Sequence, residues 1–200
     1  TVGLGLNEIN ETGCAWVVLN WQMKIIKRPA YNDELTVYTW STSADKLFAE
    51  RDFRITDKNG ETIVIATSRW LYMDINRRRP IRITPEIMDR YESEPETRVF
   101  TEKVNRIDPP DTGYIEIPYN ILRRDVDYLG HMHNISYLDA AYDVMPEEYF
   151  NGPQFNFVSI EYRKELLRND EVKAHFYKID KGCIISLNTD KINAVIMLKY

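Results

Sequence analysis

Apolar and polar side chains alternate in four stretches of the first 75 residues, a pattern that predicts β-strands. The stretches are rich in valine, isoleucine, threonine and aromatic residues, which favour strands. They cover residues 14–26, 34–42, 47–56 and 62–74. The last two are joined through Asn59-Gly60, a strong hairpin signal. We therefore expect an antiparallel meander in this part of the chain.

The second half combines strands with one helix. Residues 114–121 read as a strand, and apolar side chains then recur at helical spacing from about Asn134 to Glu148, which predicts one helix there. Strand patterns return afterwards, over residues 155–167, 171–179, 182–189 and 193–200. Between the halves, residues 76–113 carry prolines and mixed charge, so we expect a linker with one short helix from Pro85 to Glu92.

The two halves resemble each other in sequence. The run Asn32-Asp33-Glu34-Leu35 matches Asn169-Asp170-Glu171-Val172, and each run lies between two predicted strands in the same order. At the same offset Arg28 stands opposite Glu165. This indicates a duplicated unit rather than two unrelated domains.

A duplicated antiparallel sheet with one helix across it predicts an α+β tandem hot-dog fold, with curved sheets wrapped around long helices. We assign residues 1–75 to an incomplete N-terminal repeat, 76–113 to the linker and 114–200 to the C-terminal repeat. The first half shows no strand and helix before its meander, so we expect these to precede the given chain.

Composition and charge exclude several classes of protein. The chain has 200 residues and a formal net charge of −5, which argues against nucleic-acid binding by bulk electrostatics. No apolar run is long enough for a transmembrane helix, so we expect no membrane insertion. The two cysteines show no zinc-binding spacing, and we interpret them as reduced thiols of a cytoplasmic protein.

The loop DVDYLGHMHN, residues 125–134, concentrates reactive side chains just before the predicted helix. Asp127 and His131 could supply acid/base chemistry, Gly130 permits a tight turn, and unpaired amides at a helix start can bind an oxyanion. These are the groups that hydrolysis of an ester or thioester needs. Two other interpretations stay open. In one, Asp127 or Asn134 simply caps the helix, and in the other the aspartates and histidines bind a metal.

Four segments of the chain together resemble the acyl-ACP thioesterases. They are residues 27–40, 50–80, 125–146 and 159–172, and their order along the chain is the same as in that family. The resemblance implies a double hot-dog enzyme that releases free fatty acid from acyl carrier protein in fatty acid biosynthesis. It implies catalysis by the C-terminal repeat alone, with the N-terminal repeat contributing to the acyl pocket. It further implies a homodimer without cofactor or metal.

The resemblance assigns roles to individual residues. Asp127, His131 and Glu165 fall on the family's catalytic positions, and Gly130, His133 and Asn134 would position the substrate and its oxyanion. Without the resemblance, Glu165 could equally be an exposed charge among basic neighbours. Leu166 stands where the family commonly has a cysteine, which favours attack by water.

Two positions depart from the family pattern. Leu129 replaces the catalytic asparagine, and His133 replaces the first asparagine after the histidine. Leucine cannot form the hydrogen bond of an amide. The loop is therefore closer to the acyl-CoA thioesterase type, which keeps acyl-CoA hydrolysis open as an alternative, together with a non-enzymatic acyl-binding protein.

We expect Glu165 or Asp127 to act as general base on water, with His131 hydrogen-bonded between the carboxylates. An acidic carrier protein also needs a cationic landing site. The candidates for it are Arg77, Arg78, Arg79 and Arg82.

Overall fold

The computed structural model describes residues 9, 11–102, 104–127 and 130–200. It divides into two compact units, residues 1–104 and residues 105–200, here called unit 1 and unit 2. Of the residues predicted to form the linker, 76–104 fall in unit 1 and 105–113 in unit 2. No helix among the described residues is long and apolar enough to cross a membrane.

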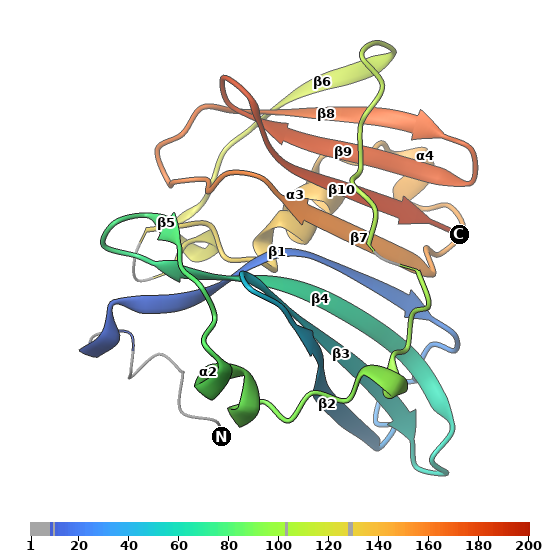
Figure 1. Ribbon diagram of the computed structural model, residues 1–200. Helices are drawn as coiled ribbons and strands as arrows, with labels where there is room; N and C mark the ends of the chain where they lie inside the picture. Colours follow the sequence, from blue (N-terminus) through green and yellow to red (C-terminus); the bar gives the residue numbers. More distant parts are fainter. Residues whose placement is uncertain (1–8, 10, 103, 128–129) are drawn as a thin grey trace. The chain divides into compact units, whose positions relative to one another are not determined.

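The predicted meander is present in unit 1 for its second to fourth strands only, because the first strand pairs with the fourth and not with the second (Figure 1). Its antiparallel strands pair in the order β2-β3-β4-β1, and short β5 pairs with β4. All four predicted strands are found within two residues of their expected ends. Their bounds are β1 (Cys14–Ile25), β2 (Leu35–Ala44), β3 (Phe48–Asp57), β4 (Thr62–Asp74) and β5 (Arg79–Pro80).

The turn between β3 and β4 shows why the hairpin forms at this point. Gly60 has a φ of +80°, a conformation that glycine adopts without strain. The Asp57 carboxylate accepts hydrogen bonds from the backbone N–H groups of Asn59 (2.9 Å) and Glu61 (3.0 Å). Desolvation works to raise the pKa of Asp57, but these two amides and the Lys27 ammonium hold it below its usual value.

After β5, unit 1 continues with the short helix α2 (Pro85–Arg90) and a 3-10 turn at Pro95–Thr97. The proline in the first turn of α2 favours a helix start there. The chain is then fastened to β3, because the Asp52 carboxylate accepts a hydrogen bond from the backbone N–H of Val99 at 2.7 Å. The short helix predicted from Pro85 to Glu92 is thus confirmed, two residues shorter than expected.

Unit 2 repeats the strand order of unit 1. Strands β8-β9-β10-β7 pair as β2-β3-β4-β1 do, and β6 is added beside β8. The repeat predicted from the sequence is therefore present in the strand pairing. The bounds are β6 (Tyr114–Tyr119), a 3-10 turn (Arg123–Asp125), α3 (Ser136–Asp143), α4 (Glu147–Phe150), β7 (Phe157–Tyr162), β8 (Val172–Ile179), β9 (Gly182–Asn188) and β10 (Ile192–Lys199).

The prediction of one long helix from Asn134 to Glu148 was wrong. The structure has two short helices, α3 and α4, with Pro146 at the start of the second. Proline disfavours helical geometry in the residue before it and has no N–H to continue the hydrogen-bond ladder. The predicted strand at 155–167 is also shorter, because the chain leaves the sheet after Tyr162.

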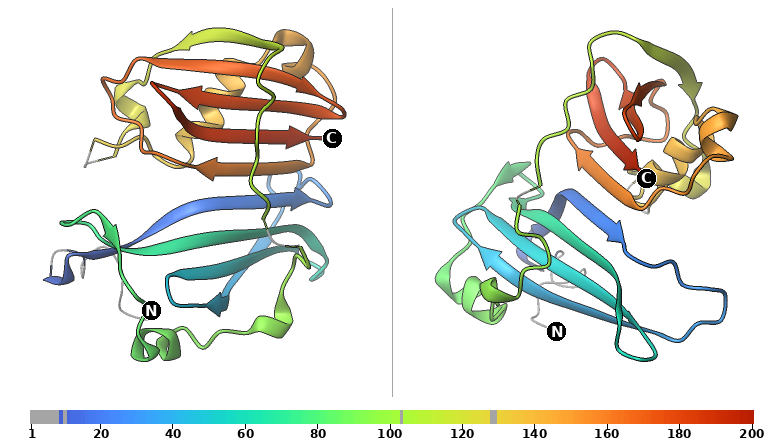
Figure 2. Two further views of the ribbon diagram at one scale, coloured as in Figure 1. Left: turned by 45° about the horizontal axis from the view of Figure 1, so that its top comes forward. Right: turned by 90° about the vertical axis from the view of Figure 1, so that its right-hand side faces the viewer.

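The helices of unit 2 lie against one face of its sheet (Figure 2). Ala140 and Ala141 of α3 are fully buried, and small side chains of this kind allow close approach to the strands. Tyr149 of α4 packs edge-on against Phe176 of β8, with ring centroids 5.0 Å apart. The fully buried side chains of β9 and β10, such as Ile185 and Ile196, complete this core.

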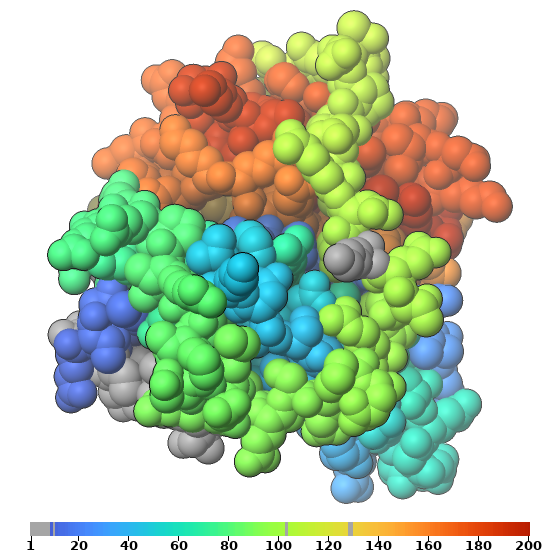
Figure 3. Space-filling view, viewed as in Figure 1, coloured from blue at the N-terminus to red at the C-terminus, as the bar shows by residue number. Residues whose placement is uncertain are grey.

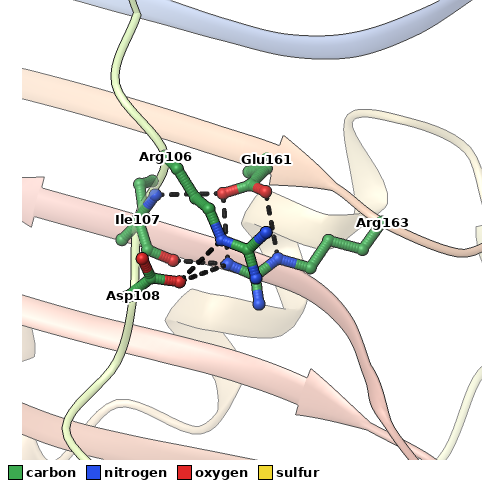
Figure 4. Close-up of polar contacts among 5 residues, drawn as sticks. All are labelled: Arg106, Ile107, Asp108, Glu161 and Arg163. Atoms are coloured by element: carbon green, nitrogen blue, oxygen red, sulfur yellow. Dashed lines mark hydrogen bonds and ion pairs between the residues drawn. The ribbon is translucent and has the colours of Figure 1, made fainter.

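The other face of this sheet is crossed by the start of unit 2. Ile107 is buried there against Tyr177, Ile184 and Val195. Figure 3 shows the segment that contains it, in yellow-green, over the orange and red strands. The backbone of Ile107 is held at both its N–H and its carbonyl by polar side chains near the end of β7 (Figure 4).

Candidate active site

The loop before α3 folds back on itself. The backbone N–H of Asp127 donates to the carbonyl of His131 (2.8 Å), and the N–H of Gly130 donates to the carbonyl of Asp127 (3.0 Å). Gly130 has a φ of +84°, as the tight turn predicted for it requires. The Asp127 carboxylate accepts a further hydrogen bond from the backbone N–H of His131, at 3.0 Å. The loop is therefore a small, internally bonded turn.

This turn is fastened to the segment that follows β7. His131 and Leu167 form an antiparallel bridge, and the backbone N–H of Met132 donates to the carbonyl of Leu166 at 2.8 Å. The bridge brings the His131 imidazole opposite the Glu165 carboxylate, with Nε2 and Oε2 3.5 Å apart. Their side chains remain 34% and 43% exposed, so the pair is open to solvent and to a substrate.

Two tyrosines connect this segment and the loop to their surroundings. The hydroxyl of Tyr137, on α3, accepts a hydrogen bond from the backbone N–H of Leu166 at 3.2 Å. Burial raises the pKa of Tyr137 to about 12, which keeps its hydroxyl neutral. The hydroxyl of Tyr162, the last residue of β7, donates to the carbonyl of Asn134 at 2.9 Å. The two segments that carry the reactive pair are thus bonded to α3 and to β7.

Arg163, two residues before Glu165, anchors the same segment from the outer side (Figure 4). Its guanidinium donates to the Glu161 carboxylate at 3.0 Å and to the carbonyl of Ile107 at 2.6 Å. Glu161 in turn accepts from the backbone N–H of Ile107 at 3.0 Å. Asp108, paired with Arg106 at 2.7 Å, completes this network.

The start of α3 bears on oxyanion binding. The amides of Gly130, His131, Met132 and His133 all donate within unit 2. By contrast, no acceptor for the backbone N–H of Asn134 or Ile135 is found in the part of the chain that the structure describes. Neither aspartate nor asparagine caps the helix, since Ile135 occupies the cap position without a side-chain bond. Two donors therefore remain beside the loop.

The structure brings together only part of the predicted site. Asp127, His131 and Glu165 lie together, and Gly130 forms the turn between the first two. His133 and Asn134 are exposed at the start of α3. Leu129 lies outside the described residues. Two residues of the site were not predicted. They are Tyr137 and Asn193, and the side-chain amide of Asn193 donates to the carbonyl of Glu165 at 3.1 Å.

The four predicted docking arginines are in unit 1, at the turn that joins β4 to β5 and just beyond it. All are exposed. The Arg77 guanidinium lies 3.8 Å from the Asp74 carboxylate, which also accepts a hydrogen bond from the backbone N–H of Arg77 at 2.9 Å. No group of three metal-binding side chains is found among the residues that the structure describes.

Two family models match the chain, one on each unit. The model of the acyl-ACP thioesterase N-terminal domain matches residues 1–91, and that of the C-terminal domain matches residues 110–197. Curated relatives include the oleoyl-acyl carrier protein thioesterase 2 of Arabidopsis thaliana, 29% identical over 78% of this chain and 46% of the relative. The palmitoyl-acyl carrier protein thioesterase of the same plant is 26% identical over 84% and 42%. The chain thus spans about half the length of these relatives.

Solved structures show the same fold. An acyl-ACP thioesterase from Bacteroides thetaiotaomicron superposes with a TM-score of 0.83 at 20% identity, over 98% of this chain and 81% of that one. The 12:0-ACP thioesterase of Umbellularia californica gives 0.82 at 19% identity, over 98% and 78%. The predicted tandem hot-dog fold is confirmed, although its helices are short. With both domain models matched in order, the chain belongs to the acyl-ACP thioesterase family.

Proposed function

We propose that this protein hydrolyses fatty acyl thioesters of acyl carrier protein, releasing free fatty acid and the carrier thiol. The observation that carries the proposal is the His131–Glu165 pair, 3.5 Å apart and open to solvent beside the start of α3. It lies in the unit that matches the C-terminal domain of acyl-ACP thioesterases. The relatives named for oleoyl- and palmitoyl-acyl carrier protein support this class of substrate.

Glu165 is the better candidate for the general base. The sequence left the choice between Glu165 and Asp127 open. In the structure one oxygen of Asp127 accepts from the backbone N–H of His131, whereas the Glu165 carboxylate faces the imidazole. A carboxylate that holds the loop backbone is well placed to orient His131. We therefore assign proton transfer to Glu165 and His131, and loop positioning to Asp127.

The reaction follows from this arrangement. Glu165 takes a proton from water as the water oxygen attacks the thioester carbonyl carbon. The carbonyl oxygen of the tetrahedral intermediate accepts hydrogen bonds from the free amides of Asn134 and Ile135. The carbon–sulfur bond then breaks, and the departing sulfur receives the proton, relayed by the Glu165–His131 pair. The products are a fatty acid and a thiol.

Apolar side chains flank the pair, as a fatty acyl substrate would require. Ile135 and Leu167 are both exposed, and they belong to the two segments that carry His131 and Glu165. Leu166, at the position where the family commonly has a cysteine, is fully buried. This supports water rather than a side chain as the nucleophile.

Turnover of defined substrates tests the proposal. Wild-type protein is assayed on oleoyl- and palmitoyl-ACP and on the matching acyl-CoA esters, beside Asp127→Asn, His131→Ala and Glu165→Gln. We expect hydrolysis of acyl-ACP, and loss of about 10²–10⁴-fold in kcat for Glu165→Gln. Faster turnover of acyl-CoA would assign the protein to the alternative class. Bound fatty acid without turnover of either substrate would indicate a non-enzymatic acyl-binding protein.

Docking of the acidic carrier is proposed at Arg77, Arg78, Arg79 and Arg82, whose exposure in unit 1 supports the assignment. Reversing the charge of Arg77 and Arg79 should raise KM for acyl-ACP, more so at low salt, and spare acyl-CoA. Lys178→Glu, an exposed change in unit 2, serves as the control. Equal effects of the arginine changes on both substrates would reject docking at this turn.

The last part of the proposal concerns the oligomeric state of the protein and its cellular compartment. We propose a cytoplasmic homodimer, on the basis of the family resemblance. The free thiols of Cys14 and Cys183 suit a reducing compartment. Sedimentation equilibrium of the purified protein should give twice the chain mass, and a monomer over the working concentration range would reject the dimer.

A further inference from the structure

The segment after β1 in unit 1 and the segment after β7 in unit 2 are joined in the same way to the hairpins β3–β4 and β9–β10. In unit 1 the carbonyl of Ile63 accepts hydrogen bonds from the N–H groups of Ile26 (2.8 Å) and Lys27 (3.1 Å). In unit 2 the carbonyl of Asn193 accepts from Arg163 (2.8 Å) and Lys164 (3.0 Å). Ile63 and Asn193 are therefore structurally equivalent residues.

Both residues also interrupt the strand register. The pairing of β3 with β4 skips Ile63, and the pairing of β9 with β10 skips Asn193, so each is the extra residue of a β-bulge. Bulges re-aim neighbouring segments and are common next to active sites. Both side chains are buried, with 1% of Ile63 and 0% of Asn193 exposed. The backbone and the burial match, so the difference lies in the side chains.

The Asn193 amide makes contacts that isoleucine cannot. Its Nδ2 donates to the carbonyl of Glu165 at 3.1 Å, and its Oδ1 accepts from both the N–H and the hydroxyl of Thr189, each at 2.9 Å. A fully buried amide is costly unless it is hydrogen-bonded. Because Ile63 forms the same junction in unit 1, the fold of this junction does not require an amide.

The Asn193 amide is in unit 2, the unit that has the Glu165 carboxylate beside this junction. Directly after the two residues that donate these hydrogen bonds, unit 1 has Arg28 and unit 2 has Glu165. The contact of Asn193 is with the Glu165 backbone, so it fixes where the Glu165 Cα lies and where its side chain begins. A displacement of about 1 Å at a reacting group can cost about 100-fold in rate.

We propose that Asn193 is a positioning residue that holds Glu165 toward His131 through its hydrogen bond to the Glu165 carbonyl. This rests on the proposed thioesterase function of unit 2. Asn193 does not touch the substrate in this account, and acts only through the place it gives to Glu165.

The first test gives unit 2 the residue of unit 1. Asn193→Ile, and Asn193→Ser as a smaller variant in case isoleucine is not accommodated, are assayed on oleoyl- and palmitoyl-ACP. We expect kcat to fall about 10- to 100-fold while KM stays within about twofold. Ile63→Val, a small change at the equivalent buried position, controls for lost stability and should keep the wild-type kcat at a similarly lowered Tm.

A double substitution separates positioning from a merely structural role. In a Glu165→Gln protein, adding Asn193→Ser should lower kcat by less than about twofold, because the group it positions is already absent. Two results would overturn the positioning role while leaving the proposed thioesterase function intact. One is that Asn193→Ser lowers kcat as much in the Glu165→Gln protein as in wild type, and the other is that Asn193→Ile and Asn193→Ser both keep the wild-type kcat. Absence of wild-type turnover on every acyl thioester would instead reject the proposed function, and the positioning role with it.

Discussion

The loop after β1 and the loop after β7 have the same backbone and different chemistry. In unit 1 the backbone N–H of Ala30 donates to the Asp33 carboxylate (2.7 Å), and the N–H of Asp33 returns to the carbonyl of Ala30 (3.2 Å). In unit 2 Leu167 and Asp170 repeat both bonds, at 2.9 and 3.0 Å. The duplicated sequence thus preserves a hydrogen-bonded loop, whatever side chains it presents.

The two units differ in the side chains around these loops. Arg28 in unit 1 stands where unit 2 has Glu165, and exposed Ile26 stands where unit 2 has the anchored Arg163. The turn that carries His131 has no counterpart among the described residues of unit 1. The comparison teaches that a shared backbone provides the scaffold, and a few substitutions on it provide the candidate site.

Loss of the imidazole should have the largest effect. His131→Ala removes the imidazole that faces Glu165, so we expect kcat to fall about 10²–10⁴-fold with little change in Tm. Asp127→Asn should cost less, because an amide oxygen can still accept from the His131 N–H. Steady-state turnover of acyl-ACP checks both variants. A larger loss for Asp127→Asn than for His131→Ala would move the base to Asp127.

A matched pair of glycines sharpens the comparison at the level of the turns. Gly60 and Gly130 both have positive φ, and a Cβ added at either would meet nothing within 4 Å. Alanine at either position should therefore cost about 1–2 kcal/mol through backbone strain alone. We expect Gly130→Ala to lower kcat several-fold as well, and Gly60→Ala to leave it unchanged. Urea unfolding and turnover assays measure the two effects, and equal kcat in both variants would contradict the comparison.

The paired aspartates should differ in the same way. Asp33→Ala and Asp170→Ala each remove a carboxylate that accepts a backbone N–H, at an expected cost of about 1 kcal/mol in unfolding free energy. Only Asp170→Ala should also reduce kcat, because Asp170 shapes the loop that follows Glu165. If Asp33→Ala impaired turnover equally, the first loop would have to contribute to catalysis.

The smallest predicted effect is a loss of stability at low pH in the turn that Asp57 holds. The pKa of Asp57 is lower in the folded protein than its unfolded value of about 3.9, so its contribution to stability is present above that pH. It is lost as pH falls through the lower, folded pKa. The amides of Asn59 and Glu61 should then lose hydrogen-exchange protection. Thr189 in unit 2 donates to the neutral Asn193 amide and should show no such step. Asp57→Asn should abolish the difference.

The strands and the repeat could be predicted because both can be recognised in the order of residues along the chain. Alternation of side chains and the Asn59-Gly60 turn define the meander, and the match of Asn32 to Asn169 defines the duplication. The helix was predicted too long because its apolar spacing continues through Pro146, where the proline ring outweighs periodicity. Secondary structure was therefore predictable up to the points where a single residue overrides the pattern.

The candidate site was predictable only in part. The Asp127–His131 loop and Glu165 could be identified from residue type and family resemblance. The role of Asn193 could not, because a buried asparagine in a strand has no distinctive pattern, and its value depends on a bulge that pairs it with Glu165. Tyr137 was missed because nothing in the sequence indicates that its hydroxyl meets the backbone of Leu166. Contacts between distant segments are what the sequence leaves unspecified.

Whether catalysis depends on Glu165 of unit 2, and not on the equivalent Arg28 of unit 1, is tested most directly by making the same substitution at both positions. Glu165→Gln and Arg28→Gln place the same neutral side chain at equivalent points, and their kcat on oleoyl- and palmitoyl-ACP is compared with that of wild type. We predict a loss of about 10²–10⁴-fold for Glu165→Gln and a rate within about twofold of wild type for Arg28→Gln. Wild-type turnover by Glu165→Gln, or equal losses in both variants, would contradict this prediction.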